Sequence, residues 1–151
     1  MRIAIAGDHR GFELKKRLLT FLAKQGHEVL DKGTLTPESC DYPDLAFAVG
    51  ETIGNKNADR GILICGTGIG MCMAANKVQG VRAANCHDHM SAELSRRHND
   101  ANVLCLSGDL IGEEQVERLV KIWLATEFEG NSRHSRRVEK IETYEKAHIS
   151  L

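Results

Sequence analysis

The chain has 151 residues, 42% hydrophobic, 27% charged and 5% aromatic, and its 20 Lys and Arg against 21 Asp and Glu leave a net charge of −1. A chain of about 150 residues buries close to 70% of its unfolded surface, so we expect one well-cored domain over residues 1–151 rather than disorder or a basic nucleic-acid binder. Its apolar runs are far shorter than the roughly 18 residues of a membrane span, and with no signal peptide in view we expect a cytoplasmic protein without membrane or nucleic-acid partners.

Short β-rich runs alternate with segments of helical period along the chain. In the first part of the chain, the sequence predicts a strand at 3–6, a helix at 12–22 ended by Gly26, a strand at 29–30, a long loop at 33–44 and a helix at 45–53. In the second part it predicts strands at 61–65, 81–86 and 102–106, separated by two helices, and then helices at 116–124 and 133–147. Strands that are apolar throughout and alternate with helices favour a parallel sheet covered on both faces. We therefore predict an α/β fold, a single three-layer α/β/α, Rossmann-like domain with a five-stranded parallel sheet and a C-terminal helix.

The cysteines are odd in number, scattered, and contain no C-x-x-C pair, which argues against a disulfide framework and a structural zinc site. They are Cys40, Cys65, Cys72, Cys86 and Cys105. His87, Asp88 and His89 form the one local cluster of metal-ligand types, but further ligands at a convincing spacing are lacking, so we expect no metal.

Ligands of open α/β sheets bind beyond the carboxyl ends of the strands, so the residues after each strand are the candidates for chemistry. Asp8 and His9 follow the first strand, between Gly7 and Gly11. A carboxylate and an imidazole at this turn suit hydrogen bonding to a polar ligand. The alternative is an Asp that caps the next helix beside an incidental histidine.

Cys65 ends the third strand and is followed by glycines at positions 66, 68 and 70. Alternating glycines let backbone N–H groups converge on an anion or oxyanion, and such donors favour the thiolate form of Cys65, which can then act as a base or nucleophile. The loop lacks the last glycine of G-x-G-x-x-G, the G-K-[ST] ending of a P-loop, and the arginine of a cysteine phosphatase loop. A tight strand-to-helix turn without chemistry is the alternative reading.

Two further polar groups lie near helix ends. Residues 95–100 end the helix before the fifth strand, and Arg133 and Arg137 are four residues apart at the start of the last helix. The two arginines share one helix face, and their guanidinium groups match phosphate oxygens. A solvated surface is the alternative for both groups.

Taken together, these segments resemble the ribose-5-phosphate isomerase type B family, which includes allose-6-phosphate and galactose-6-phosphate isomerases. The resemblance covers nearly the whole chain. It is carried by residues 6–9 with Gly11, by 41–43, 61–70, 74–77 and 95–104, and by Arg133, His134, Arg137 and Val138.

The resemblance implies interconversion of ribose 5-phosphate and ribulose 5-phosphate without a metal or organic cofactor. Cys65 would be the base that moves a proton from C2 to C1 through a cis-enediolate, and Thr67 would bond the thiol or the sugar. His98 would open the furanose ring, and Asp8 would assist there or hold sugar hydroxyls. The oxyanion and sugar would be held by the loop residues Gly66, Thr67, Gly68, Ile69 and Gly70.

The resemblance also implies that His9, Arg133 and Arg137 bind the phosphate, while Tyr42 and Asn99 contact the sugar. In this family the active site lies between two subunits. We therefore expect a homodimer, or a dimer of dimers, and an inactive monomer.

One position departs from the family pattern. The family commonly has an arginine for the phosphate end of the substrate where this chain has Asp109, and a carboxylate there would repel a phosphate dianion. Either Arg10 or Arg136 compensates, or the preferred sugar differs. The alternatives are thus an isomerase of allose 6-phosphate, galactose 6-phosphate or a free aldose, and a non-catalytic small-anion-binding domain that has no need of Cys65.

Overall fold

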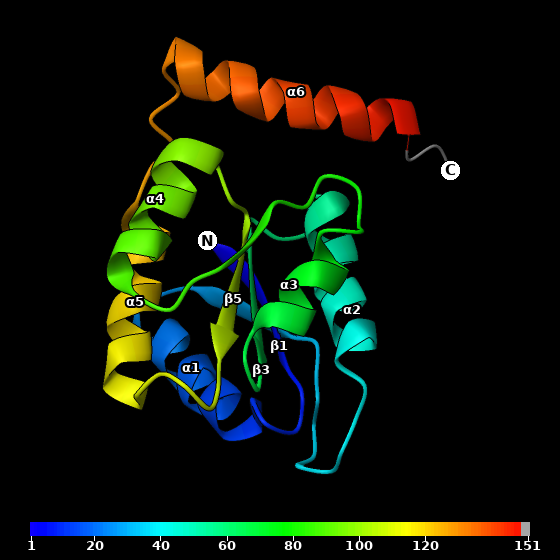
Figure 1. Cartoon of the computed structure of the whole chain (residues 1–151). Helices are drawn as coiled ribbons and strands as arrows, with labels where there is room; N and C mark the ends of the chain where they lie inside the picture. Colours follow the sequence, from blue (N-terminus) through cyan, green and yellow to red (C-terminus); the bar gives the residue numbers. More distant parts are fainter. Residues whose placement is uncertain (149–151) are drawn as a thin grey trace.

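The computed structural model describes residues 1–148, so the last three residues of the predicted domain, 149–151, lie outside the described part. Strands and helices alternate as predicted (Figure 1). The elements are β1 (Arg2–Gly7), α1 (Phe12–Lys24), β2 (Glu28–Asp31), α2 (Tyr42–Gly54), β3 (Arg60–Cys65), α3 (Ile69–Ala75), β4 (Ala83–Asn85), α4 (His89–Asn99), β5 (Val103–Ser107), α5 (Glu113–Ala125) and α6 (Ser132–His148).

The sheet has the strand order β2-β1-β3-β5-β4, and each neighbouring pair is parallel. One apolar core joins the sheet to α1, α4 and α5, and it includes the fully buried Trp123. A second core joins the opposite face to α2 and α3 through residues such as Val49 and Met71. The side chains of β1 and β3 are buried on both faces, because successive residues enter the two cores in turn. The predicted three-layer α/β/α fold is confirmed.

Several predicted boundaries are wrong, among them those of the loop before α2, of β4 and of α5, which begins at Glu113 rather than at residue 116. The loop predicted at 33–44 ends at Asp41, because Pro43 lies in the first turn of α2, where its missing N–H costs nothing. The strand predicted at 81–86 is only Ala83–Asn85. It shortens because the Arg82 N–H donates to the Asn102 side-chain oxygen at 2.7 Å rather than to a strand partner.

The last helix, α6, lies at the end of the sheet at which the strands begin, above α4 (Figure 1). Its described buried residues, His134 and Val138, lie in its first half. Farther along, Ile141 and Tyr144 are 55% and 67% exposed, so the second half of α6 has an unpartnered apolar face. Within residues 1–148, the helices are all too short or too polar to cross a membrane.

Candidate active site

The thiol of Cys65 lies at the carboxyl end of β3, at the centre of the sheet, and the residue is 5% exposed. The Gly68 N–H donates to its Sγ atom over 3.1 Å. Gly68 makes this contact with φ = 79°, in the left-handed region, and a Cβ atom here would collide with the Asn85 side-chain oxygen. The sequence therefore folds into a turn in which glycine is needed to aim a backbone donor at sulfur.

Asp8 directly follows β1, at the end of the sheet where β3 ends in Cys65, because Gly7 and Ile64 are paired in the β1–β3 register. The residue is 4% exposed, and its Oδ1 accepts the N–H groups of Arg10 at 2.9 Å and Gly11 at 3.1 Å. These bonds fix the carboxylate in the turn after β1.

His9 follows Asp8 in this turn and is held by the long loop before α2. Its Nδ1 atom accepts the Cys40 N–H over 3.4 Å. In the neutral ring the proton is then on Nε2, which leaves a donor for a polar or anionic ligand. Cys40 was not singled out from the sequence, because a backbone donor carries no side-chain signal.

The remaining predicted loop residues meet Tyr42 from α2. Thr67 Oγ1 accepts the Ile69 N–H over 3.3 Å, and Ile69 itself is 51% exposed. The Tyr42 ring lies directly on Gly70, where a Cβ atom would come within 2.5 Å of the ring. The structure thus brings together at one edge the residues predicted there, namely Asp8, His9, Tyr42, Cys65, Gly66, Thr67, Gly68, Ile69 and Gly70.

The end of β5 anchors the backbone around the thiol. The buried Ser107 hydroxyl donates to the Gly66 carbonyl over 2.6 Å, and the Gly108 N–H donates to the Cys65 carbonyl over 2.8 Å. Sequence reasoning missed Ser107. The signal that finds it is the register, because Ser107 pairs with Cys65.

The second predicted group surrounds the end of α4. His98 stacks on His134 with ring centroids 4.2 Å apart, and Glu129 Oε2 lies 3.8 Å and 3.7 Å from their respective Nε2 atoms. Burial, and next the charge of His98, lower the pKa of His134. The sequence analysis did not predict a role for Glu129, and it named His134 only as part of a family motif. Both residues lie far from His98 along the chain, so their contact with it is not visible in the sequence. Asn99 and Arg133 adjoin this cluster in sequence, and Arg137 follows one turn later on α6.

The two groups lie at opposite edges of the sheet. Cys65 pairs with Ser107 at the end of β5, whereas His98 and Asn99 come just before β5 begins. Five strand residues span about 13 Å, and α6 covers the edge that is distant from Cys65 (Figure 1). A single copy of the chain does not bring the predicted site residues together.

Among the described residues, His98, Glu129 and His134 are the group whose ligand atoms come within 4.8 Å of one another, as a metal site would require. The imidazole planes are only 11° apart. Stacked, nearly parallel rings direct their nitrogen lone pairs side by side rather than toward a shared ion. In the His87–His89 segment, Asp88 instead caps α4 by accepting the Ser91 N–H over 2.7 Å.

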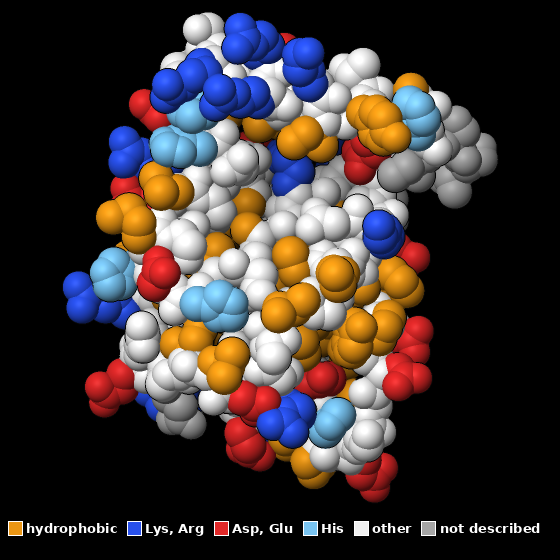
Figure 2. All heavy atoms as spheres, viewed as in Figure 1, with side chains coloured by type: hydrophobic (Ala, Val, Ile, Leu, Met, Phe, Trp, Pro, Cys, Tyr) orange, Lys and Arg blue, Asp and Glu red, His pale blue; other side chains and the backbone are white. Residues whose placement is uncertain are grey.

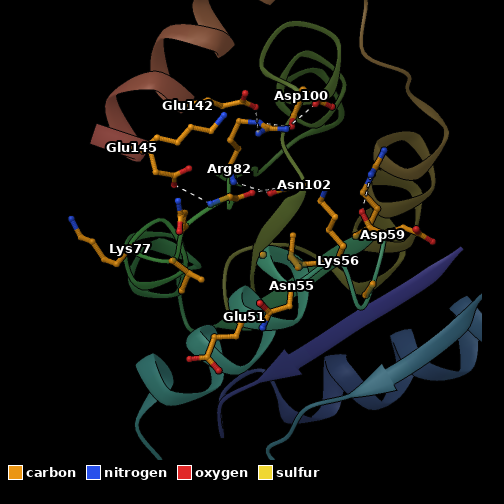
Figure 3. Close-up of a pocket in the computed structure, with 18 residues that line it drawn as sticks. Glu51, Asn55, Lys56, Asp59, Lys77, Arg82, Asp100, Asn102, Glu142 and Glu145 are labelled. Carbon is orange, nitrogen blue, oxygen red and sulfur yellow. Dashed lines mark hydrogen bonds and ion pairs between the residues drawn. The ribbon is translucent and has the colours of Figure 1, made fainter. Parts of the chain in front are cut away.

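A broad cleft of about 1130 Å³ lies between the second half of α6 and the ends of α2 and α3 (Figure 3). Arg82 crosses its wall and is paired with Asp100 at 2.8 Å and with Glu142 of α6 at 3.1 Å. The lining carries both signs of charge and does not include Cys65. This cleft is therefore distinct from the predicted site around Cys65.

Exposed apolar side chains gather over α2 and α3, beside the Cys65 loop (Figure 2). Tyr42 and Phe47 are 39% and 37% exposed, and Ile69 and Met73 are 51% and 66% exposed. We call these four residues the α2–α3 patch. Contiguous exposed apolar groups of this kind are typical of a protein–protein contact.

The model of the family described as Ribose/Galactose Isomerase matches residues 3–141. The chain belongs to this family. Ribose-5-phosphate isomerase B of Escherichia coli K12 is 45% identical over 144 residues, 95% of this chain and 96% of that protein. D-erythrulose-4-phosphate isomerase of Pectobacterium atrosepticum is 42% identical over 146 residues, 96% of this chain and 95% of the relative.

A solved structure extends the similarity to three dimensions. The ribose-5-phosphate isomerase B of Mycoplasma genitalium, with bound ribulose-5-phosphate, has a TM-score of 0.92 and 46% identity, and the match covers 96% of each chain. The Ribose/Galactose Isomerase fold is thus shared over almost the whole length.

Proposed function

We propose that this chain is an aldose–ketose isomerase that interconverts ribose 5-phosphate and ribulose 5-phosphate. Membership of the Ribose/Galactose Isomerase family and the named relatives support the reaction class. The observation that carries the proposal is the Cys65 thiol, which accepts the Gly68 N–H at 3.1 Å at the end of the sheet that also carries the buried Asp8. The domain is proposed to span residues 1–151.

Cys65 is the proposed base. A backbone N–H aimed at sulfur stabilises the thiolate, which removes the proton from C2 of the open-chain aldose. The C2–H electrons form the C1–C2 double bond and the carbonyl electrons move onto O1, which gives a cis-enediolate. The thiol returns the proton to C1 while the O2 proton passes to O1, so that a ketone forms at C2. The reaction moves protons only and needs no redox cofactor.

The Cys65 loop has the donors for this intermediate. The backbone N–H groups of residues 66–70 are proposed to stabilise the enediolate oxygens, apart from those of Gly68 and Ile69, which donate to Cys65 Sγ and Thr67 Oγ1. Thr67 is proposed to contact the sugar hydroxyls. Asp8 is proposed to accept a sugar hydroxyl through its second carboxylate oxygen, because two backbone donors on Oδ1 already fix the orientation of the group. Tyr42, on Gly70, is proposed to bound the sugar on the α2 side.

We propose that a second copy of the chain completes the site. His98, which would open the furanose ring, and Asn99, Arg133 and Arg137, which would hold the sugar and its phosphate, lie at the edge distant from Cys65. A two-fold dimer places this edge of one copy against the carboxyl edge of the other. The α2–α3 patch beside the Cys65 loop is then buried by the contact. The assembly is a homodimer, or a dimer of two such dimers.

The cytoplasm is the proposed location. The five cysteines are free thiols, as in proteins that work in a reducing compartment. Cys65 is the group that needs this environment, because oxidation of its sulfur would abolish the proposed base.

A second candidate is the same chemistry on a different sugar phosphate. The similarity to D-erythrulose-4-phosphate isomerase favours it, because 42% identity is close to the 45% shared with ribose-5-phosphate isomerase B. Asp109, in place of an expected arginine near the phosphate end, also leaves this candidate open.

The deciding experiment is turnover of ribose 5-phosphate, allose 6-phosphate, galactose 6-phosphate, erythrulose 4-phosphate and free ribose by the full chain. We expect the highest kcat/KM on ribose 5-phosphate, and we expect Cys65→Ala to lower kcat by about 10²–10⁴-fold, the range of a general base. Cys86→Ala, at a buried cysteine away from the proposed chemistry, is the control. Full turnover by Cys65→Ala would remove the base assignment, and no turnover of any aldose phosphate by the wild type would favour a small-anion-binding domain.

A further inference from the structure

An ion pair between Arg10 and Asp109 lies over the backbone next to Cys65. The Arg10 Nε atom donates to Asp109 Oδ2 over 2.6 Å, and Nη2 contacts the same oxygen. A Cβ atom on Gly66 would lie 2.9 Å from that carboxylate oxygen and 3.0 Å from Arg10 Nε. The pair therefore joins the loop after β1 to the loop after β5, directly above the residue that follows the proposed base.

Asp109 is anchored to the backbone around Cys65, and its side chain is less exposed than that of Arg10. Its backbone N–H lies 3.2 Å both from the Gly66 carbonyl and from the Ser107 hydroxyl, so its loop is attached to the Cys65 backbone. The Arg10 side chain is 57% exposed, against 33% for Asp109. Because Arg10 uses Nε and Nη2 on one oxygen, its Nη1 group remains directed away from the pair, and the planar guanidinium retains donors for a second anion.

Other cations at this edge are less suited to a ligand. Lys15 is 1% exposed, and its ammonium donates to the Asp31 carboxylate over 2.7 Å and to the Thr34 carbonyl over 2.7 Å. Arg133 and Arg137 lie on α6, at the opposite edge of the same copy. Arg10 is thus exposed and also lies next to Gly66 of the same copy of the chain, unlike these other cations.

We propose that Arg10 binds the phosphate group of the sugar phosphate, and that Asp109 is a positioning residue that holds the guanidinium over Gly66. This inference rests on the proposed function and names a specificity-determining residue for it. It also accounts for a carboxylate near a dianionic substrate, because the charge of Asp109 is neutralised by Arg10 before the substrate arrives.

The test compares Arg10→Ala, Arg10→Lys and Asp109→Asn with the wild type. The measured quantities are KM and kcat on ribose 5-phosphate and the inhibition constant of inorganic phosphate. For Arg10→Ala we expect KM and the inhibition constant to rise together by about tenfold or more, as for loss of a hydrogen bond to a charged group, while kcat changes by less than about threefold. Arg10→Lys retains part of the phosphate affinity, and Asp109→Asn raises the inhibition constant by a smaller factor.

The control is Arg2→Ala, because Arg2 is also an exposed arginine paired with a carboxylate, that of Glu28, but lies at the other end of β1. It should change neither constant. An unchanged inhibition constant in Arg10→Ala, with a folded protein by urea unfolding, overturns the inference. Two measurements separate the failure of the two proposals. Absence of turnover by the wild type would defeat the isomerase. Equal affinity of wild type and Arg10→Ala for inorganic phosphate, measured by calorimetric titration, would defeat the role of Arg10.

Discussion

The imidazole of His134 is packed against that of His98, with ring centroids 4.2 Å apart and planes 11° apart. Two protonated rings at this distance repel each other, and His134 is only 4% exposed, so protonation also removes a charge from water. Burial and then the charge of His98 therefore lower the pKa of His134, although Glu129 acts in the opposite direction. The folded chain favours a neutral His134.

This arrangement predicts a loss of stability in mild acid. A histidine whose pKa is lower in the folded than in the unfolded state binds more protons when unfolded, so its contribution is retained above about pH 6.5, the ordinary value, and is lost as the pH falls below it. We expect the free energy of unfolding to decrease more between pH 7 and pH 5 in the wild type than in His134→Asn, measured by urea denaturation. His87→Asn, at an exposed position, is the control. Its free energy of unfolding should decrease between pH 7 and pH 5 by as much as that of the wild type. Parallel curves for wild type and His134→Asn would contradict the prediction.

The separation of Cys65 from His98 predicts complementation between inactive variants. Cys65→Ala and His98→Asn should each be inactive alone, because each damages both sites of a homodimer. In a mixture that has exchanged subunits, half of the dimers are mixed and one of their two sites is intact, so about a quarter of the wild-type activity should return. Mixing Cys65→Ala with Asp8→Asn is the control, since both changes lie at the same edge and no intact site forms. Equal recovery in both mixtures, or none in either, would contradict the shared site.

The contact of Tyr42 with Gly70 predicts a helical position where alanine brings no gain in stability. Gly to Ala in a helix ordinarily stabilises a protein by up to about 1 kcal/mol. Here the added Cβ would come 2.5 Å from the tip of the Tyr42 side chain, which is 39% exposed and can move aside. We therefore expect Gly70→Ala to lose this gain, with a stability change below about 1 kcal/mol, and to raise KM by displacing Tyr42. The double variant Gly70→Ala/Tyr42→Ala should show the gain again, so that the double-mutant cycle gives a measurable coupling. Additive effects would show that the ring does not press on this position.

Cys72 predicts a reactive thiol separate from the proposed base. A hydrogen bond with Cys105 is the largest influence, and others from Asn85 and Asn76 add to it, so the pKa of Cys72 is lowered to about 7. We expect the rate at which iodoacetamide labels Cys72 to reach half its maximum near pH 7. Peptide mass spectrometry of samples labelled at different pH values measures this rate. Cys86 is the internal control, because burial raises its pKa and it should react slowly until the pH is well above neutral. Labelling of Cys86 before Cys72 at pH 7 would contradict the prediction.

The fold was predictable because burial leaves a direct record in the residue pattern. The runs at 61–65 and 102–106 consist of apolar residues with little else, and they are β3 and β5 to within one residue at each end. The run at 81–86 predicted too much strand, because Arg82 is drawn to Asn102 by hydrogen bonds that the local pattern does not contain. Helix starts were displaced where Pro43 looked like part of a loop.

The candidate site was predictable only where its chemistry is local in sequence. Cys65 and the glycines after it form one recognisable segment, whereas Ser107 and Glu129 are ordinary polar residues until the strand register and the packing of α6 place them. The partner of Asp109 was likewise one of several possibilities in the sequence, and the loop geometry selects Arg10. The catalytic and binding roles of these residues stay predictions until the variants are measured.

The anchoring of the backbone around Cys65 to the end of β5 affects how the protein can be re-engineered. Both carbonyl groups that flank the thiol are tied to Ser107 and Gly108, upstream of the exposed Leu110. A longer or shorter segment grafted after Leu110 would leave these ties intact. The loop after Leu110 can therefore be exchanged while the backbone of Cys65 keeps its position.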